Sequence, residues 1–376
     1  MLTGVTEVEP AAWDALLGPE DSPFHEHAFL AACERASAVP EEGAQAQHLT
    51  LWEGERLVAA LPLYLKGDGR GEFIYDYHWW ELAARNGLRY YPKAVAMSPY
   101  TPVAGARLLA DPGLSRPALW RALAEVLEAF GRELELGGVH LLFCSDEEAS
   151  ALEEAGWLRR LSYQPRWEDQ GYGDLEGFLA RFNHKHRVVA KRERRKLSEQ
   201  GLEVTALTGE ELGPAEWAAM HGFYERTCAA YGTGSDYLKP GTWDALFEGW
   251  RARLVLFLAR RDGEPVGGSL CVHKGEELYG RYWGSREELD CLYFNLAFHE
   301  PIAWALARGV RRFYAGFGNS RAKYGRGLLP CATHSVHRLF DPALSRAIAA
   351  HLEEDRREVA AAMERERGRS RLKPAP

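Results

Sequence analysis

The chain has 376 residues, 46% of them hydrophobic and 11% aromatic, so it holds ample material for packed cores, and its length predicts two domains at about 100–200 residues each. Lys and Arg together number 46 and Asp and Glu 54, which gives a formal net charge of −8. No apolar run reaches the roughly 20 residues that a membrane helix needs, and the acidic start excludes a typical export signal. We therefore expect a soluble protein of the cytoplasm.

Six cysteines lie at least 20 residues apart without a C-x-x-C pair. This spacing excludes a zinc knuckle or a dithiol redox motif and fits small buried side chains in a reducing cytoplasm. A single catalytic cysteine is the less favoured alternative. His334 and His337 are three apart on a predicted strand, so they point to opposite faces and make a poor ligand pair. We expect no metal site.

The sequence contains an internal repeat. Residues 53–61 (EGERLVAAL) and 262–270 (DGEPVGGSL) each place an acid-Gly-acid turn between apolar runs, which predicts one β-hairpin in each half of the chain. Helical patterns follow at 117–136 and 292–308.

The repeat continues beyond the helices. An apolar strand begins near Val139 in the first half and near Val310 in the second. The distances to Gly156 and Gly327 are equal, since 156 − 139 = 17 and 327 − 310 = 17, and a short predicted helix ends at each glycine. Hairpin, helix, strand and helix, occurring twice, predict two similar α/β domains of mixed sheets.

We place the expected domains at 1–168 and 169–345, joined by the acidic, Gly-rich segment RWEDQGYGDLEGF near residues 165–180. Residues 346–376 begin as a charged amphipathic helix and end in a tail that we expect to be disordered. This helix either packs on the second domain or mediates pairing.

The order of elements resembles the GNAT acyltransferase unit, and CSDEEASALEEAGWL is similar to the final helix of that unit. Two such units in tandem resemble the FemAB-type peptidyltransferases. More narrowly, GEFIYDYHWW, NGLRYYPK, SPYTPVAGARLL, RVVAKRERRKL, LYGRYWGS and RGLLPCATHSVH resemble the bacterial FemAB-like family of predicted N-acyltransferases. The resemblance implies tandem GNAT-like domains that transfer an acyl or aminoacyl group to an amine, with a cell-wall (peptidoglycan) precursor as acceptor.

The chain departs from that family at four positions. Relatives usually carry a His and a Glu where this chain has Tyr293 and Asn295, and a Glu-His pair where it has Arg321 and Ala322. If those groups move protons in relatives, this protein uses other residues or has lost the reaction.

Acyl transfer to an amine needs a proton acceptor and donors aimed at the developing oxyanion. The GNAT phosphate signature, a basic residue and Gly-x-Gly before a helix, is missing, because the corresponding loop GSREELDC carries three acids. The resemblance then favours aminoacyl-tRNA as the donor and leaves acyl-CoA as the alternative. We expect no tightly bound cofactor.

Residues 181–197 (RFNHKHRVVAKRERRKL) contain eight Lys and Arg against one acid, Glu193, so their net charge is 8 − 1 = +7. The apolar spacing from Phe178 to Leu197 predicts a helix with one packed face and a basic remainder. The simplest reading is a solvated helix; the alternative is a tRNA or phosphate contact through Arg187, Lys191, Arg192 and Arg195.

In the first half, residues 73–80 (FIYDYHWW) alternate as a strand would, with Asp76 and His78 on one face. A carboxylate beside an imidazole could form an acid–base pair, although an exposed Asp and a hydrogen-bonded His are the simpler reading. Trp79 and Tyr100 lie in the aromatic stretch that begins here.

In the second half, alternation places Tyr282 between Gly280 and Gly284 on one face of a predicted strand, where glycines let a backbone or a ligand approach. Glu300 precedes the helix-breaking Pro301 and is a candidate base. The loop that follows the next strand suits anion binding. The predicted site residues are Asp76, Tyr282 and Glu300 as catalytic groups; Trp79, Tyr100, Arg281, Trp283, Asn295, Lys323, Tyr324 and Arg326 in substrate binding; and Gly316, Gly318 and Asn319 in cofactor binding.

The sequence thus predicts an N-acyltransferase with its cleft on the second domain or between the two. An acyl-CoA-dependent enzyme without the usual phosphate loop is one rival. The others are a non-catalytic GNAT-fold binding protein and an RNA-binding module that uses residues 181–197.

Overall fold

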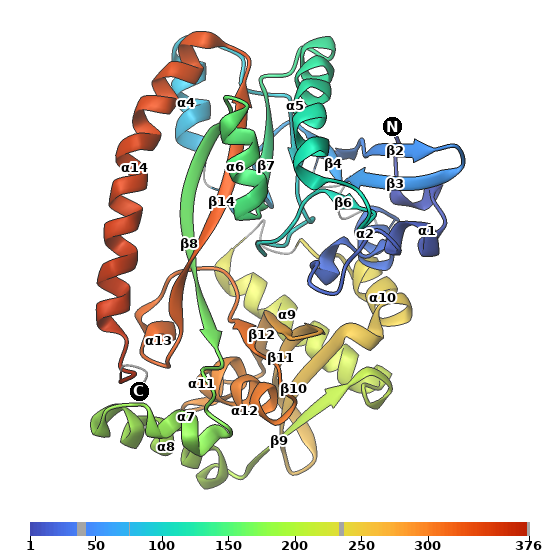
Figure 1. Cartoon of the computed structure of the whole chain (residues 1–376). Coiled ribbons are helices and arrows are strands. Elements are labelled where there is room, and N and C mark those ends of the chain that lie inside the picture. The colour runs from blue at the N-terminus through green and yellow to red at the C-terminus, as the bar shows by residue number, and fades with distance from the viewer. Residues whose placement is uncertain (36–42, 75, 233–236, 374–376) are drawn as a thin grey trace. The chain divides into compact units, whose positions relative to one another are not determined.

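The computed structural model describes residues 1–35, 43–74, 76–232 and 237–373, which form a mixed α/β structure (Figure 1). They divide into two compact units. Unit 1 contains residues 1–163, 237–246 and 332–362, and unit 2 contains residues 164–236, 247–331 and 363–376. The first boundary falls close to the expected one, but each unit also takes up later segments, so neither matches the continuous domains 1–168, 169–345 and 346–376.

Unit 1 is built on a sheet with the strand order β1-β4-β5-β7-β14-β8 and also holds a small sheet, β2-β3-β6. Strands β5 and β7 are parallel and are connected by helix α5. Trp120, Leu127 and Leu141 are buried in the core that α5 and α6 form with these strands. The elements within this unit are η1 (Val5–Glu7), α1 (Pro10–Asp14), η2 (Pro23–His25), α2 (His27–Arg35), β1 (Ala44–Ala46), β2 (Leu49–Glu53), β3 (Arg56–Leu61), β4 (Leu63–Lys66), α4 (Tyr77–Arg85), β5 (Lys93–Ala96), β6 (Leu109–Ala110), α5 (Arg116–Glu133), β7 (Gly138–Cys144) and α6 (Asp146–Glu154).

A strand from the end of the chain completes unit 1. Strand β14 pairs antiparallel with β7, so that His337 lies opposite His140. Helix α14 follows it, and its Leu344, Ile348 and Leu352 join a cluster with Trp79 and Ala83 of α4. The first part of the C-terminal helix therefore packs within unit 1. Four elements run from one unit into the other: β8 (Leu158–Glu168), α10 (Pro240–Gly249), β14 (Leu329–Leu339) and α14 (Pro342–Arg369).

Unit 2 is built on a sheet with the order β8-β13-β12-β11-β10-β9. Strand β10, next to the edge strand β9, is apolar on both faces. Val255 and Phe257 join the core with η5 and α12, whereas Leu256 and Leu258 lie near Met220 of α9. No helix among the described residues is long and apolar enough to cross a membrane. The elements are α7 (Leu175–Ala180), α8 (His184–Glu199), β9 (Leu202–Thr208), η3 (Gly209–Glu211), α9 (Pro214–Tyr231), η4 (Arg251–Arg253), β10 (Leu254–Arg261), β11 (Glu264–Lys274), β12 (Glu277–Ser285), α11 (Leu292–Phe294), η5 (Asn295–His299), α12 (Glu300–Ala307), β13 (Arg312–Tyr314) and α13 (Arg321–Tyr324).

The predicted repeat is present in the structure. Both hairpins form, β2 with β3 and β10 with β11. The two short helices also end alike, because the backbone N–H of Trp157 donates to Leu152 at 3.0 Å and that of Leu328 donates to Lys323 at 3.4 Å. Leu152 and Lys323 therefore occupy equivalent positions in the two copies.

Among the described residues of the aromatic stretch 73–80, which leave out residue 75, no strand forms, and residues 77–80 begin a helix instead, so this prediction is wrong. Helix α4 begins in it because Trp79 and Ala83, four residues apart, form one buried helix face. Asp76 precedes the helix and is buried, while the side chain of His78 is 72% exposed. The predicted face shared by Asp76 and His78 therefore does not exist.

The predicted disordered tail is wrong for residues 370–373, and residues 374–376 lie outside the described ones. The N–H of Asn183 donates to the carbonyl of Arg371 at 3.1 Å, and the N–H of Lys373 donates to that of Arg181 at 2.7 Å. Leu372 pairs between them with Phe182. Within unit 2, the chain's last described residues thus form a short antiparallel pairing directly before helix α8.

Gly284 of β12 offers a test of how helix α9 packs on the sheet of unit 2. A Cβ atom there would lie 2.2 Å from the carbonyl oxygen of Phe223 on α9, which is too close for any side chain. We expect Gly284→Ala to lower the free energy of unfolding by about 2 kcal/mol or more, because the helix must move away from the sheet. Urea unfolding measures this change. Gly222→Ala on α9, where nothing lies within 4 Å, should be neutral or stabilising; an equal loss in both variants would contradict the packing.

Candidate active site

The parallel strands β12 and β13 of unit 2 pair over three residues and then part. The paired residues are Glu277 with Arg312, Leu278 with Phe313 and Tyr279 with Tyr314. Beyond this point β13 leads into the loop 315–320. This loop starts close to β12, since a Cβ atom on Gly316 would lie 3.3 Å from the carbonyl oxygen of Gly280.

Strand β12 contains a β-bulge at this position. Leu270 pairs with Tyr282 and Cys271 pairs with Gly280, so Arg281 is the extra residue. The bulge breaks the expected alternation: the guanidinium of Arg281 lies over the ring of Tyr282 and donates to its hydroxyl at 3.3 Å. The prediction that these two side chains lie on opposite faces is therefore wrong.

The glycines that flank Tyr282 accommodate backbone atoms. Gly280 lies next to the carbonyl of Tyr314 and Gly284 next to that of Phe223. The predicted close approach is confirmed for neighbouring backbone. Trp283 packs its ring against Tyr293, with centroids 4.9 Å apart.

Lys323 is a buried lysine on α13. Its Nζ donates to the carbonyl oxygens of Gly316 at 2.9 Å and Phe317 at 2.8 Å, so the amine lies against the loop that follows β13. Burial lowers its pKa from 10.5 to about 8, because the charged form is poorly solvated. Tyr324 donates to Asn319 at 2.8 Å and so ties the same loop to the helix.

A second group surrounds Glu193, the single acid of the basic run. Ala190, Glu193 and Leu197 form the buried face of α8. The carboxylate of Glu193 lies 2.9 Å from His299 and 2.6 Å from Arg326. Burial favours the neutral acid, but the hydrogen bond with His299 and the charge of Arg326 outweigh this and lower the pKa of Glu193.

Asn295 belongs to the same group. Its Nδ2 donates to the carbonyls of Glu193 and Cys291, both at 2.9 Å, and so fixes α8 to the π-helix η5. Burial lowers the pKa of His299 against the opposing hydrogen bond from Glu193. Glu300 opens α12 beside the predicted break at Pro301, and it pairs with Arg194 at 3.0 Å.

Asp76 lies in unit 1 within a buried charge cluster. The Nζ of Lys93 is 2.6 Å from Asp76 and 2.8 Å from Glu72, and the hydroxyl of Tyr90 also donates to Asp76. Burial raises the pKa of Glu72 to about 7 despite the nearby Lys93. For Asp76, burial also favours the neutral acid, but the charge and hydrogen bond of Lys93 outweigh it and lower the pKa.

The two aromatic candidates of unit 1 are buried. Trp79 meets the ring of His337 edge to face at 4.8 Å. Tyr100 stacks on Tyr237 at 5.2 Å and fills the space next to Gly71. Both side chains contribute to packing around the charge cluster.

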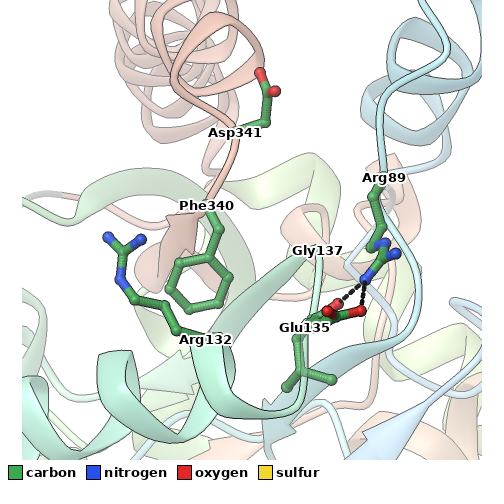
Figure 2. Close-up of a pocket in the computed structure, with 7 residues that line it drawn as sticks. Arg89, Arg132, Glu135, Gly137, Phe340 and Asp341 are labelled. Atoms are coloured by element: carbon green, nitrogen blue, oxygen red, sulfur yellow. Dashed lines mark hydrogen bonds and ion pairs between the residues drawn. The ribbon is translucent and has the colours of Figure 1, made fainter.

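A pocket of about 400 Å³ in unit 1 is lined by none of the candidates. Figure 2 shows Arg89 bonded to Glu135 and Arg132 turned toward Phe340, whose ring centre lies 5.3 Å from the guanidinium. The oxygen Oδ1 of Asp341 accepts from the first N–H groups of α14. These polar groups are already engaged with one another, so this pocket offers no evident chemistry. Its lining is Arg89, Arg132, Glu135, Leu136, Gly137, Phe340 and Asp341.

The predicted phosphate contacts lie along α8, which begins three residues later than the basic run. Lys191 and Arg195 form surface ion pairs with Glu176 and Glu199. Arg192 is exposed and Arg187 is half-buried. Since exposed pairs are worth only about 0–1 kcal/mol, these cations remain available to an anion. In the part of the chain that the structure describes, no group of three His, Cys, Asp or Glu side chains could hold a metal ion.

Most second-half candidates thus fall into two groups of unit 2. The first group lies at the loop after β13, where Lys323 and Tyr324 contact Gly316 and Asn319, with Gly318 in the loop itself; Arg281 and Tyr282 contact each other at the neighbouring bulge of β12. In the second group, Asn295 and Arg326 join Glu193. Sequence reasoning missed the pairing of Glu193 with His299. Its signal was present, because a lone acid in a basic helix, at the spacing of the apolar face, must be buried with a partner.

Comparison with known proteins shows to which family the chain belongs. The expected mixed α/β fold is confirmed, and FemX shares it. A family model, FemAB-like, described as peptidoglycan biosynthesis/recognition, matches residues 4–373. The chain therefore belongs to the FemAB-like family. No curated protein matches the sequence significantly.

Solved structures share the fold at low sequence identity. The C-terminal domain of a putative lysylphosphatidylglycerol synthetase from Agrobacterium fabrum matches with a TM-score of 0.57 and 12% identity, over 93% of this chain and 97% of that one. FemX matches with a TM-score of 0.56 and 12% identity, over 91% of this chain and 98% of that one. L-PGS from Bacillus licheniformis matches with a TM-score of 0.52 and 10% identity, over 92% of this chain and 98% of that one.

The buried carboxylate of Glu193 provides one test. We expect Glu193→Gln to lower the free energy of unfolding at pH 7 by about 2–4 kcal/mol, because Arg326 is left without its counter-charge. Glu199→Gln, which breaks only the exposed pairs with Arg195 and Lys196 on the same helix, should change the free energy of unfolding far less. Because the folded pKa of Glu193 is lowered, its contribution is lost as the pH falls below 4.5. Equal losses in the two variants would show that Glu193 is not anchored as described.

Lys323 provides a second test, which measures how the free energy of unfolding changes at alkaline pH. Because its pKa is lowered in the folded state, the unfolded chain binds more protons between pH 8 and 10.5, and stability rises with pH in that window. From pH 7.5 to 9.5 we expect wild type to gain about 1–2 kcal/mol relative to Lys323→Met in urea unfolding. Parallel pH profiles of the two proteins would refute the lowered pKa.

Proposed function

We propose that this protein is an N-acyltransferase that moves an acyl or aminoacyl group onto an amine of a peptidoglycan precursor in the cytoplasm. Family membership and the shared fold support a role in cell-wall synthesis. The observation that carries the catalytic part is Lys323. It is a buried lysine with a lowered pKa, standing where the first copy of the repeat has the core residue Leu152. A charge at a core position is costly and needs a reason beyond packing.

The geometry supports a direct transfer. As the acceptor nitrogen attacks the carbonyl carbon, the new C–N bond forms and the bond to the donor's oxygen or sulfur breaks. The nitrogen's proton passes to neutral Lys323, of which about a quarter is present at pH 7.5 with a pKa of about 8, against about one in a thousand for an ordinary lysine.

Tyr282 is the group we assign to the oxygen side of the reaction. Its hydroxyl accepts a hydrogen bond from Arg281 at 3.3 Å. The hydroxyl would donate to the oxyanion and then to the leaving group. Lys323 contacts Gly316, and Gly316 lies beside Gly280 next to the bulge, so both groups border the point where the strands part.

Aminoacyl-tRNA is the donor that we favour. Helix α8 presents Arg187, Lys191 and Arg195 at intervals of four residues, so they lie along one side of the helix. The loop 284–291 offers no Gly-x-Gly turn for the pyrophosphate of coenzyme A.

A non-catalytic binding protein is the second candidate. It is favoured by Asn295, which stands where relatives usually carry a Glu and whose amide fixes α8 to η5. Arg321 and Ala322 likewise carry no acid or imidazole.

The proposal is tested by incubating the protein with acceptor peptides of peptidoglycan precursors and either acyl-CoA or a total aminoacyl-tRNA pool, with products read by mass spectrometry. We expect a mass increase of one aminoacyl group at a free amine. Tyr282→Phe should lower kcat by about 100-fold with little change in KM, since its hydroxyl acts in the transition state. Tyr231→Phe, at an 81% exposed tyrosine of unit 2, is the control. No transfer with any combination would favour the non-catalytic protein.

A further inference from the structure

A cationic pocket lies in unit 2 away from the bulge of β12. Its volume is about 320 Å³, and it brings together three separate parts of the chain: the start of α8, helix α13, and the end of α14 with the segment after it. The lining residues are His186, Arg321, Tyr324, Gly325, Glu366, Arg369 and Arg371.

The charges in this pocket do not balance. Its one acid, Glu366, bonds to Arg369. In the described part of the chain, neither Arg321 nor Arg371 has a carboxylate within 4 Å. Two unpaired guanidinium groups on one small pocket repel each other, and a bound anion would remove this repulsion.

His186 fits the same ligand. Its Nδ1 shares a hydrogen bond with Asn183 Oδ1 at 2.9 Å, and because an amide oxygen only accepts, Nδ1 carries the proton. Burial, Arg371 and Lys185 lower the pKa of His186. A phosphate in the pocket would reverse the effect of these positive charges.

The C-terminal segment holds Arg371 in place. The antiparallel pairing of residues 370–373 with 181–183 positions it beside the first turn of α8. From this end of α8 the row Arg187, Lys191 and Arg195 continues for eight residues, or about 12 Å at 1.5 Å per residue. A pocket followed by a line of cations fits a chain of phosphates better than a single small anion or a flat lipid surface.

We propose that this pocket binds a backbone phosphate of an RNA whose following phosphates lie along α8, and that the C-terminal segment completes the site. The proposal deepens the suggested use of aminoacyl-tRNA, and it concerns RNA binding alone, which is measured without any transfer. If the protein does not bind RNA at this pocket but transfers an acyl group from another donor, this inference is refuted and the acyltransferase proposal stands.

The test is fluorescence anisotropy with labelled tRNA across a salt series, using the full chain. We expect Arg321→Gln with Arg371→Gln to weaken binding at low salt at least tenfold and to reduce the slope of log K against log salt by about 1, since one phosphate contact is lost. Arg286→Gln with Arg357→Gln is the matched control, because these exposed arginines lie outside the pocket and the change in net charge is equal. Thermal unfolding checks that both double variants are folded.

A second variant separates the segment from its charge. Leu372→Asn should release residues 370–373 from Phe182 and weaken RNA binding as much as the loss of Arg371, although it leaves the net charge unchanged. Equal RNA affinity in the pocket and control variants would overturn the proposal. So would binding of anionic lipid vesicles that is stronger than RNA binding and is lost in the pocket variant.

Discussion

The candidate site depends on the short length over which β12 and β13 pair. Only three residue pairs hold the parallel strands together, ending at Tyr279 and Tyr314. Since the backbone of β12 is not paired with β13 beyond that point, a bulge at Arg281 and the loop from Gly316 both follow immediately. A longer parallel ladder would fill this place with hydrogen bonds and leave no position for Lys323 against the loop carbonyls. Separation of two strands is thus the structural condition for the chemistry proposed.

Helix α8 shows how one element serves two purposes. Its buried face carries Glu193, which joins His299 and Arg326 and fixes the helix to the core of unit 2. Its exposed faces keep an excess of positive charge that is not needed for folding. Because this charge network adds to the small apolar face of Ala190 and Leu197, the helix keeps a low apolar content and still packs in one orientation.

Much of the fold could be predicted from the sequence, and the reason is local. The hairpins and glycine caps follow from short patterns whose geometry is fixed within a few residues. The strand predicted at 73–80 is wrong because alternation over eight residues cannot be told from the start of a helix when the buried pair, Trp79 and Ala83, is completed later. The pairing of residues 370–373 with 181–183 depends on a partner far away in the sequence, so no local pattern reveals it. The bulge at Arg281 depends on the register between β11 and β12, which strict alternation along one strand does not show. Candidates such as Lys323 and Tyr282 could be named, but their neighbours could not.

The return of β14 to unit 1 also bears on how the protein is made. His140 and His337 face each other across β7 and β14 but are 197 residues apart in the chain. All strands that make up the sheet of unit 2 have been synthesised by Tyr314, whereas the core of unit 1 waits for residues after 331. On the ribosome, the sheet of unit 2 can therefore be completed before that of unit 1, although unit 2 still lacks its last residues, 363–376. Until the last part emerges, the nascent chain presents the open edge of β7, a surface that chaperones must cover.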